Sequence, residues 1–383
     1  MVLDFAFNEE QELFRKTVHD FAKSEIEPKI HAFELKGEYP WELHRKMGEM
    51  GLIGLPLPKR YGGQEADPVT AGIAIEELAK YQVPSPALEY AAGQFIAVFG
   101  KDSVKSQWLP RLSRGEILLG IGSTEPHAGS DAAAMRASAV KNEEGYTLNG
   151  EKQMVTIPME ASAFVVFAKT AAEAGSRGIS AFLVPMDSPG ISRYRFPTMG
   201  SRAASFGGFV MNNVRVPKEN LLGQENAGFY ALMKTFDLLR ILLAVYCIGL
   251  AEASLEETVD YVKQRKAFGQ PIGKFESVQF RIAEDSTLVE AARLLCYKAL
   301  WMIGRGERST KESAMAKWWS PAVAFNAINN CIQNRGAVGY TSEAADELRL
   351  REARGMWFAD GTADIMKIII SREILGKEFV PYR

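Results

Sequence analysis

The sequence predicts a multi-domain α+β protein in which helical regions lie on either side of a β-rich middle region. The chain has 383 residues, too many for one ordinary core, so two or three substructures are expected. Apolar residues recur every three or four positions near both ends, whereas short β-rich runs between turn signals fill the middle. We expect an N-terminal helical domain over residues 1–117, an antiparallel β-barrel over 118–222 and a four-helix bundle over 223–383.

The composition indicates a soluble globular protein. Apolar residues make up 47% and charged residues 24% of the chain, and 45 basic residues nearly balance 47 acidic ones. The charges form no basic block, which argues against a nucleic-acid partner. The N-terminus shows no secretory leader, and we expect no membrane span and a cytoplasmic location. Cys247, Cys296 and Cys331 lie too far apart in sequence for a metal site, so we expect reduced thiols.

The first region reads as a series of amphipathic helices. Asn8 and Gln11 form a predicted capping box for a long helix that ends near Pro28. A second helix is expected over residues 41–50, closed by Gly51. Further helices are expected over 71–79 and 91–99.

The middle and last regions differ in the secondary structure that their sequence patterns predict. Asn149–Gly150 and Pro189–Gly190 are turn signals between β-rich runs, whereas the last region returns to long periodic helices. The segment 241–250 carries no charge, which suggests a subunit contact. The expected strands include residues 146–148, 163–168, 179–184 and 208–211, and the expected late helices are 229–263, 278–304, 310–335 and 361–379.

One segment, residues 356–366, organises the candidate chemistry. An apolar run ends at Asp360, Gly361 permits a turn, and an apolar helix follows. Asp360 could be the N-cap of that helix, since aspartate is a favoured capping residue. It could instead be a general base, because Trp357, Phe358 and Ala359 can remove water from its carboxylate and raise its pKa.

This segment resembles the C-terminal Glu-Gly-Thr motif of the acyl-CoA dehydrogenase family, with Asp360 in place of the glutamate. In the family that glutamate removes the α-proton of an acyl-CoA thioester while the β-hydride goes to FAD. The resemblance covers nearly the whole chain, and implies a homotetramer reoxidised by an electron-transfer flavoprotein. It also implies that Gly361 contacts the substrate and that Thr362 and Asp364 contact FAD.

A second motif, residues 121–131, resembles the family's Thr-Glu-Pro-Gly-Ala-Gly-Ser-Asp signature, with His127 in place of the first glycine. Small residues and hydroxyls on a turn let the backbone approach a planar ring and bond its carbonyl oxygens. By itself such a loop is usually only a turn. The resemblance implies that Thr124 contacts the flavin pyrimidine and that Ser130 lies between cofactor and acyl-CoA. The FAD contacts that it implies here are Ile121, Ser123, Thr124, Gly129 and Ser130.

A third motif, residues 152–156, resembles the family's Trp-Ile-Thr segment. The resemblance places Thr156 near the flavin nitrogen that accepts hydride, and Met154 where a tryptophan usually packs on the flavin. A methionine in a strand is otherwise ordinary core filling.

Two further motifs are implied to serve the FAD of a neighbouring subunit. The segment 265–269 resembles Arg-x-x-Phe-Gly, and the guanidinium of Arg265 suits a pyrophosphate, although a helix-end arginine is otherwise usually solvated. The segment 333–340 resembles a glycine-rich turn in which Ala337 replaces a glycine, and Gly336 could equally be a helix C-cap. Glu276 replaces a common glutamine. The implied contacts are Arg265, Phe268, Phe275, Glu276, Gln333, Arg335, Gly336 and Ala337.

Asp237 and Arg240 resemble the family's Asp-x-x-Arg pair on the helix that meets CoA. An intrahelical ion pair is the simpler interpretation of residues three apart. Some family members carry their catalytic glutamate where this chain has Leu239, so the role of base falls to Asp360.

The departures from the family pattern bear on the substrate. An aspartate carboxylate is withdrawn by about 1.5 Å relative to glutamate. Ala359 and Met154 replace larger aromatic residues, which suggests a reshaped pocket for an α-branched or alicyclic acyl-CoA. Glu89 falls near the far end of the implied acyl pocket, although an exposed helix-end glutamate is the simpler interpretation. Alternatives are an enoyl-CoA reductase, a nitroalkane-oxidase-like flavin oxidase, or a scaffold with a degenerate site.

Overall fold

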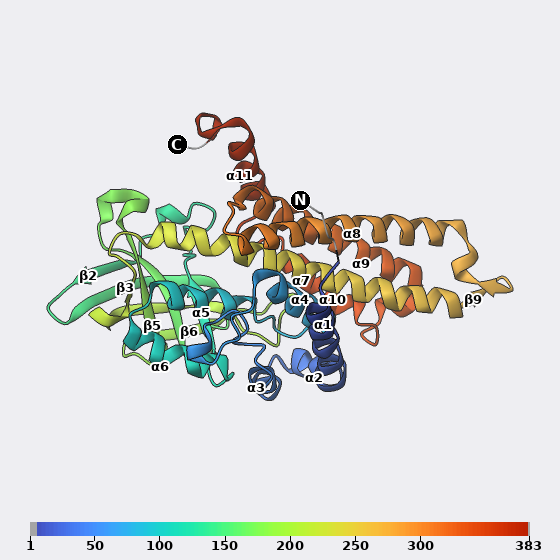
Figure 1. Ribbon diagram of the computed structural model, residues 1–383, viewed down its shortest axis with the longest axis horizontal. Coiled ribbons are helices and arrows are strands. Elements are labelled where there is room, and N and C mark those ends of the chain that lie inside the picture. The colour runs from blue at the N-terminus through green and yellow to red at the C-terminus, as the bar shows by residue number, and fades with distance from the viewer. Residues whose placement is uncertain (1–5, 382–383) are drawn as a thin grey trace. The chain divides into compact units, whose positions relative to one another are not determined.

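The structure is a computed structural model that describes residues 6–381, and Figure 1 follows the order of its elements. The chain divides into two compact units, each described by itself. The helical unit comprises Met1–His31, Asp67–Ser85 and Arg240–Arg383, and the sheet unit comprises Ala32–Ala66 and Pro86–Leu239. The bounds of the three predicted domains remain predictions.

The capping box at the start of the first helix is confirmed. Helix α1 (Glu9–Phe21) begins after Asn8, whose side chain accepts from the Gln11 N–H while the Gln11 side chain accepts from the Asn8 N–H. The predicted end near Pro28 is wrong. A π-helical turn (Ala22–Ile26) leads into α2 (Glu27–Lys36), where Pro28 lies in the first turn. The π-helical turn before α2 accommodates the proline, which has no N–H to continue the helical hydrogen bonds.

The remaining early helices follow the sequence pattern. Helix α3 (Trp41–Glu49) is confirmed, and α4 (Pro68–Ala79) starts three residues early because the Asp67 side chain accepts from the Val69 and Thr70 N–H groups. Helix α5 (Ala87–Phe99) also starts before its prediction, and α6 (Asp102–Ser113) follows it.

The sheet unit contains the β-rich region, which is confirmed. One sheet has the strand order β6-β7-β3-β2-β4-β5-β8. Most neighbours are antiparallel as predicted, but β1 runs parallel to β4, so the sheet is mixed. The long connection through β2 and β3 makes that parallel pairing reachable. The strands are β1 (Leu119–Gly122), β2 (Ser138–Lys141), β3 (Gly145–Thr156), β4 (Ala163–Lys169), β5 (Ile179–Pro185), β6 (Ile191–Arg195), β7 (Phe206–Pro217) and β8 (Leu221–Leu222).

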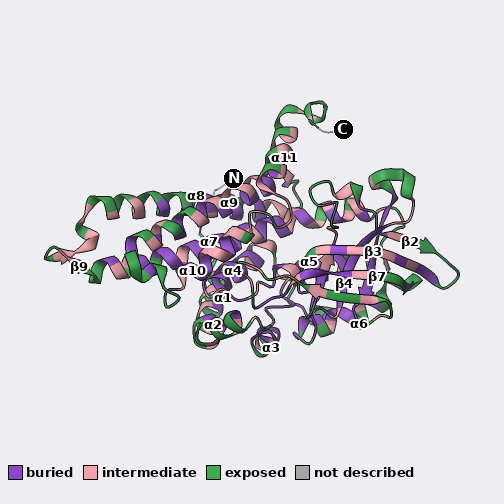
Figure 2. Ribbon diagram, turned by 180° about the vertical axis from the view of Figure 1, so that it is seen from behind, coloured by how far each residue is buried: buried purple, intermediate pink, exposed green. Residues whose placement is uncertain are grey.

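The core of the sheet unit lies on β4 and its neighbours. Six consecutive residues of β4 are buried, as are six of β5, and Figure 2 shows β4 as a largely buried strand. Phe164, Phe182 and Phe209 are wholly buried in this core. A strand buried on both faces reads as a continuous apolar run, which explains why the sequence identified β4 and β5 so readily.

The helical unit is built on long helices. Helices α7 (Gly228–Gln264), α8 (Glu276–Gly304) and α9 (Thr310–Arg335) run side by side in Figures 1 and 2. Helices α10 (Asp346–Gly355) and α11 (Ala363–Leu375) pack on α9. Two short strands, β9 (Lys266–Ala267) and β10 (Gln270–Pro271), form the turn between α7 and α8. The predicted helix over 361–379 ends early, at Leu375.

Helix α7 is long and apolar enough, by composition alone, to cross a membrane, which the sequence analysis did not anticipate. Its most apolar window has a mean hydropathy of 1.9, and 89% of that window is buried in the protein. That degree of burial is typical of a core helix.

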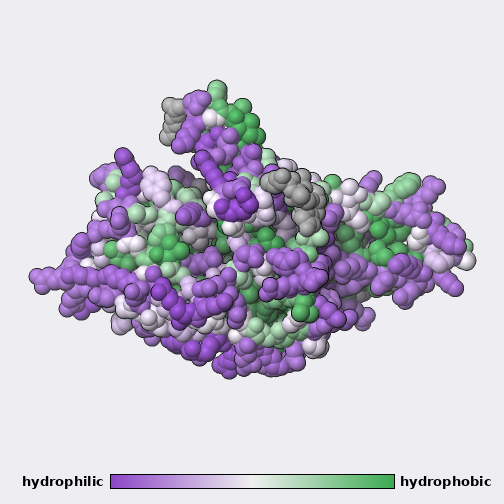
Figure 3. Space-filling model, viewed as in Figure 1, coloured by the Kyte–Doolittle hydropathy of each residue, from purple (hydrophilic) through white to green (hydrophobic). Residues whose placement is uncertain are grey.

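Apolar side chains also remain on the surface. On α8, Phe280, Leu288, Leu294 and Trp301 are each at least 42% exposed. Figure 3 shows hydrophobic patches among the hydrophilic surface on the face drawn there.

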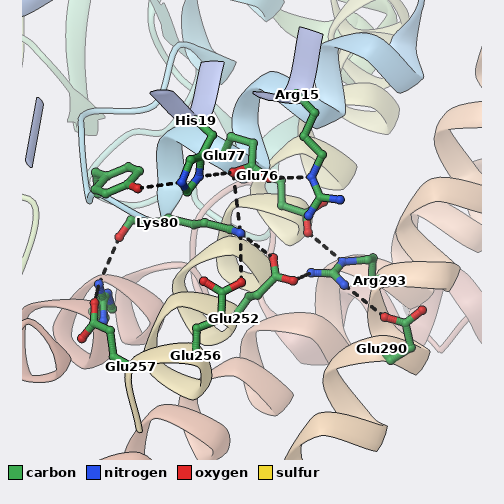
Figure 4. A network of polar contacts seen from close by, with 12 residues as sticks. Arg15, His19, Glu76, Glu77, Lys80, Glu252, Glu256, Glu257, Glu290 and Arg293 are labelled. Carbon is green, nitrogen blue, oxygen red and sulfur yellow. Dashed lines mark hydrogen bonds and ion pairs between the residues drawn. The ribbon is translucent and has the colours of Figure 1, made fainter. Parts of the chain in front are cut away.

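A network of charged side chains joins α1, α4, α7 and α8 within the helical unit (Figure 4). Arg15 Nε lies 2.7 Å from Glu77 Oε1, and Arg293 Nε lies 2.7 Å from Glu76 Oε1. Lys80 Nζ lies 3.1 Å from Glu252 Oε2. Each buried cation of this network therefore has a carboxylate partner, as buried charges require.

Candidate active site

The loop between α10 and α11 presents Asp360 in an unusual conformation. Asp360 has φ +51°, and Gly361 has φ +112°. The capping interpretation of Asp360 is wrong, because Thr362 is the N-cap of α11 and its hydroxyl accepts from the Ile365 N–H at 3.3 Å. Strained backbone of this kind persists only when surrounding contacts fix it, and it clusters at functional sites.

Two buried cations fix this loop. Arg240 Nε donates to the Asp360 carbonyl oxygen at 2.9 Å. Lys317 Nζ donates to the carbonyl oxygens of Met356 at 2.7 Å and Gly361 at 3.4 Å. Burial raises the pKa of the Asp360 carboxyl above its ordinary value, although Lys317 and Arg240 act in the opposite direction. Asp360 therefore combines a raised pKa with nearby cations, as a general base requires.

The apolar neighbours of Asp360 act less simply than predicted. Phe358 is 57% exposed, so much of its ring faces away from the protein interior. The guanidinium of Arg354 lies 4.6 Å from the ring centres of both Trp357 and Phe358. The backbone N–H of Asp360 makes no hydrogen bond within residues 6–381, so it is available to a ligand oxygen.

The remaining predicted contacts near Asp360 have ordinary explanations. Asp364 is exposed and pairs with Lys367 at 3.6 Å, whereas Thr362 is occupied by its capping bond. Arg240 is only 5% exposed and Asp237 lies one turn earlier on α7. The predicted CoA contact of this pair is not tested, but Arg240 holds the backbone of Asp360.

The loop after β1 in the sheet unit supplies the predicted flavin contacts. Ile121 lies in β1 and Ser123 follows it. The hydroxyls of Thr124, Ser130 and Thr156 make no hydrogen bond within residues 6–381. A Cβ added to Gly129 would meet nothing closer than 4.0 Å, so this side of the loop is open. Free hydroxyls and open backbone fit a flat polar ring such as a flavin.

Met154 is not core filling. It is 50% exposed, has φ +55°, and forms a bulge opposite β7 between Gln153 and Val155. Ile157 has φ +58°, which is a genuine outlier for a β-branched residue. The two strained residues flank the exposed Thr156, and bulges next to active sites commonly re-aim side chains in this way.

A buried ion pair joins this loop to β3. Lys152 Nζ lies 2.8 Å from Glu125 Oε1 and donates to the Ser123 carbonyl oxygen at 3.2 Å. Glu125 also accepts from the N–H groups of Arg136 and Ala137 at 2.6 and 2.9 Å. Burial lowers the pKa of the Lys152 ammonium to about 8, although Glu125 acts in the opposite direction. This pair therefore connects β3 to the loop after β1 and to the segment that precedes β2.

The contacts predicted for a neighbouring subunit's FAD lie in two places in the helical unit. Arg265, Phe268, Phe275 and Glu276 share the turn between α7 and α8, where Phe268 is 95% exposed with φ +51°. The Phe268 and Phe275 ring centres are 6.1 Å apart. Such an exposed aromatic residue suits contact with another molecule.

The second place is the end of α9. Gly336 is the C-cap, with φ +62°, so the capping interpretation is confirmed. Ala337 does not have a positive φ, so alanine is accommodated at this position without backbone strain. Gln333 is exposed. The Arg335 guanidinium is already engaged by Glu257 at 3.1 Å and Asp346 at 3.2 Å, which weighs against its predicted cofactor contact.

Glu89 is not an exposed helix-end residue. It lies in the first turn of α5 and is 4% exposed. Burial raises the pKa of its carboxyl to about 8, although its own backbone N–H acts in the opposite direction. No ion pair to Glu89 occurs in the described part of the chain. A buried, unpaired carboxyl is a functional candidate with a physical reason.

The sequence analysis missed two lysines, Lys152 and Lys317. Lys317 lies in the run Ala314-Met-Ala-Lys-Trp-Trp319, where one charge amid apolar residues was the available signal. Lys152 begins the motif over residues 152–156, in which only Met154 and Thr156 were assigned a role. Among residues 6–381, no group of three His, Cys, Asp or Glu side chains could hold a metal ion.

Three family models match the chain. They are described as the acyl-CoA dehydrogenase N-terminal domain over residues 8–116, the middle domain over 120–214 and the C-terminal domain over 226–375. The chain is 37% identical to the probable acyl-CoA dehydrogenase YngJ of Bacillus subtilis (strain 168), over 97% of this chain and 100% of that one. It is 35% identical to the caffeyl-CoA reductase-Etf complex subunit CarC of Acetobacterium woodii, over 97% and 100%.

Solved structures are similar over the same length. Butyryl-CoA dehydrogenase from Megasphaera elsdenii has a TM-score of 0.93 and 34% identity, with 97% of this chain and 100% of that chain covered. The FAD complex of PigA has a TM-score of 0.93 and 28% identity, with coverage of 97% and 99%.

Proposed function

Because the chain belongs to the acyl-CoA dehydrogenase family of FAD-dependent oxidoreductases, we propose that it dehydrogenates an α-branched or alicyclic acyl-CoA, with Asp360 as the base. The observation that carries the proposal is the 356–361 loop. Its aspartate has a raised pKa, a strained backbone and two cations that hold it.

Asp360 would take the α-proton of the thioester. Its unbonded backbone N–H would donate to the thioester carbonyl oxygen, which acidifies that proton. The Thr124, Ser130 and Thr156 side chains would bind FAD, and Ser130 would also face the acyl-CoA. Bound FAD would supply the hydride acceptor for the β-carbon. The exposed Arg265 and Phe268 would serve the FAD of a second copy.

The substrate class follows from the length of the base. Aspartate withdraws the carboxylate by about 1.5 Å, so an efficient transfer needs an α-carbon that lies closer to the loop. A ring or a branch at the α-carbon adds bulk there, where the small Ala359 precedes the base. A straight chain would leave that space empty and lose contact area.

An anaerobic absorbance titration tests this function. The FAD-loaded protein is mixed with matched straight-chain, α-branched and alicyclic acyl-CoAs, and bleaching of the flavin band is followed. The proposal expects faster and more complete bleaching by a branched or ring thioester. A clear preference for straight chains contradicts the substrate class, whereas no bleaching by any thioester contradicts the reaction.

A second candidate reaction is proton removal beyond the α-carbon by Glu89. Its burial in α5 and its raised pKa support this candidate. The test compares Asp360→Ala with Glu89→Gln on ring substrates. Activity that survives Asp360→Ala and is lost in Glu89→Gln favours Glu89, and the reverse pattern favours Asp360 alone.

The direction of reaction and the partners are separate proposals. We expect electron transfer to an electron-transfer flavoprotein, which the Etf complex of the relative CarC supports. The same relative is a reductase, so a reductive direction is the alternative, and NADH-coupled or flavoprotein-coupled assays distinguish the two. Peroxide formation in air would identify an oxidase instead. The exposed apolar residues of α8 support a homotetramer, to be tested by analytical ultracentrifugation.

A further inference from the structure

Lys317 ties together the two ends of the loop that carries Asp360. The side chain comes from α9, is 1% exposed, and donates to the Met356 and Gly361 carbonyl oxygens. Met356 is the C-cap of α10, and Gly361 lies just before the N-cap of α11. One ammonium therefore closes the loop from inside the helical unit.

Lys317 differs from other buried cations because no carboxylate lies within 4.0 Å of its ammonium in the described residues. Lys80, by contrast, has Glu77, Glu252 and Glu256 within that distance. Burying an unpaired ammonium is unfavourable unless other groups compensate. Burial lowers the pKa of Lys317 to about 8, with Cys247 and Asp360 acting in the opposite direction.

The backbone of this loop needs contacts that hold it in its strained conformation. Asp360 and Gly361 both have positive φ, and a Cβ on Gly361 would lie 2.6 Å from Met366 Cε. Without fixed carbonyls the loop could relax, and the carboxylate would move. A displacement of about 1 Å can reduce a positioned reaction by roughly 100-fold.

The charged and titratable groups around the loop are few. Arg240 and Cys247 lie on α7, Lys317 on α9 and Arg354 on α10. Arg240 holds the Asp360 carbonyl, and Arg354 lies over the aromatic rings. Lys317 is thus the cation that contacts both ends of the loop and acts on the Asp360 carboxylate.

We propose that Lys317 is a positioning residue for Asp360: its ammonium fixes the loop through two carbonyl oxygens, and its charge stabilises the carboxylate form of the base. This role rests on the proposed function of Asp360. A merely structural lysine would affect folding, but it would not shift the acid limb of the pH profile.

The experiment compares Lys317→Met and Lys317→Gln with Lys311→Met, a control at a partly exposed lysine of the same helix that pairs with Glu312 at 3.4 Å. Anaerobic stopped-flow flavin reduction by the best wild-type thioester is followed from pH 5 to 9. We expect Lys317→Met to reduce the rate by about 10–100-fold while thioester affinity changes by less than about 3-fold. Loss of the cation raises the pKa of Asp360, so the acid limb moves to higher pH by about half a unit or more.

A rate within about twofold of Lys311→Met, with an unmoved acid limb, overturns the proposal. Lys317→Gln keeps a hydrogen-bond donor but loses the charge. Its rate should therefore lie between those of Lys317→Met and the wild type, while its acid limb should lie at the same raised pH as that of Lys317→Met. If Lys317→Met does not fold, the rate of flavin reduction and the position of the acid limb are measured on Lys317→Gln instead, and they test the proposal in the same way.

Failure of the proposed function is recognised separately, because the wild type would then not be reduced by any thioester. In that case the thermal unfolding of Lys317→Met, Asp360→Asn and the double variant is compared at pH 7. A non-additive double variant supports the coupling of the two residues, and additivity overturns it.

Discussion

Lys152 in the sheet unit and Lys317 in the helical unit are both wholly buried, and burial lowers the pKa of each to about 8. Lys152 has a carboxylate partner, Glu125, which two backbone N–H groups also hold. Within residues 6–381, the Lys317 ammonium has only carbonyl oxygens as hydrogen-bond partners. Lys152 and Glu125 form a pair with no net charge that connects backbone segments. The charge of Lys317 is not neutralised by a carboxylate partner in this way, so it can stabilise the Asp360 carboxylate.

This contrast indicates a structural role for Lys152 and a role in proton transfer for Lys317. A paired buried charge stabilises the loop that holds it, and its field is largely cancelled by the partner. An unpaired one stabilises any anion that approaches, which suits a loop that must keep a base ionised. Removing Lys152 should therefore harm folding and FAD binding first, and removing Lys317 should harm proton transfer first.

The largest expected effect is that of removing the Asp360 carboxylate, which Lys317 is proposed to stabilise. Asp360→Ala should slow flavin reduction by about 10²–10⁴-fold, because a positioned general base contributes that much. Its FAD affinity should stay within about threefold of wild type, since the proposed flavin contacts Thr124, Ser130 and Thr156 lie in the sheet unit and Asp360 lies in the helical unit. Stopped-flow reduction and FAD fluorescence titration of the apoprotein measure the two effects, and a parallel loss of FAD affinity would contradict the separation.

Lys152→Met should destabilise the protein by about 3–5 kcal/mol and weaken FAD binding, because Glu125 loses its buried partner. Chemical unfolding and FAD titration of the apoprotein measure this. Lys141→Met is the matched control, since Lys141 is an exposed lysine in the same sheet. The double variant Lys152→Met/Glu125→Gln should recover part of the loss; no recovery would show that the pair is not the cause.

The lysine pKa values predict a specific pH dependence of stability. Below about pH 8 Lys317 is protonated in both folded and unfolded chains, and its burial destabilises the fold. As pH rises from about 8 toward 10.5, the unfolded chain binds more protons, so the free energy of unfolding contributed by this group rises. Lys317→Met should lose that rise relative to wild type in thermal melts. An unchanged pH dependence would mean that burial does not lower the pKa of Lys317 below its value in the unfolded chain.

The smallest expected effect is that of removing the N-cap of α11. This variant tests whether the cap contributes as much to the position of Asp360 as Lys317 does. Thr362→Ala should destabilise α11 by about 1 kcal/mol, because the Ile365 N–H loses its cap. Thr362→Ser keeps the hydroxyl and serves as the control. A rate loss in Thr362→Ala as large as in Lys317→Met would contradict the special position of the lysine.

The sequence predicted those features that depend on local pattern. The Asn8 cap, the buried strands β4 and β5, and the order of helical and β-rich regions follow from spacing that local forces impose. The end of the first helix was misplaced, because a π-helical turn accommodates Pro28. The start of α4 was missed by three residues although Asp67 and Pro68 signalled it.

The candidate site was predicted only in part. Motif resemblance placed Asp360, Thr124 and Thr156, but not their conformations, since positive φ at Asp360 and Met154 depends on contacts from distant segments. Lys317 is 43 positions before Asp360 in sequence, and only the packing of α9 against the loop brings them together. Likewise, no sequence spacing distinguishes a buried Glu89 from an exposed one.

The most direct test lengthens the base. Stopped-flow flavin reduction of the wild type and Asp360→Glu is compared on an alicyclic and a straight-chain acyl-CoA. One methylene advances the carboxylate by about 1.5 Å, so the ratio of alicyclic to straight-chain rates should fall by about tenfold or more in the variant. An unchanged ratio would contradict the claim that the short base at position 360 selects the substrate.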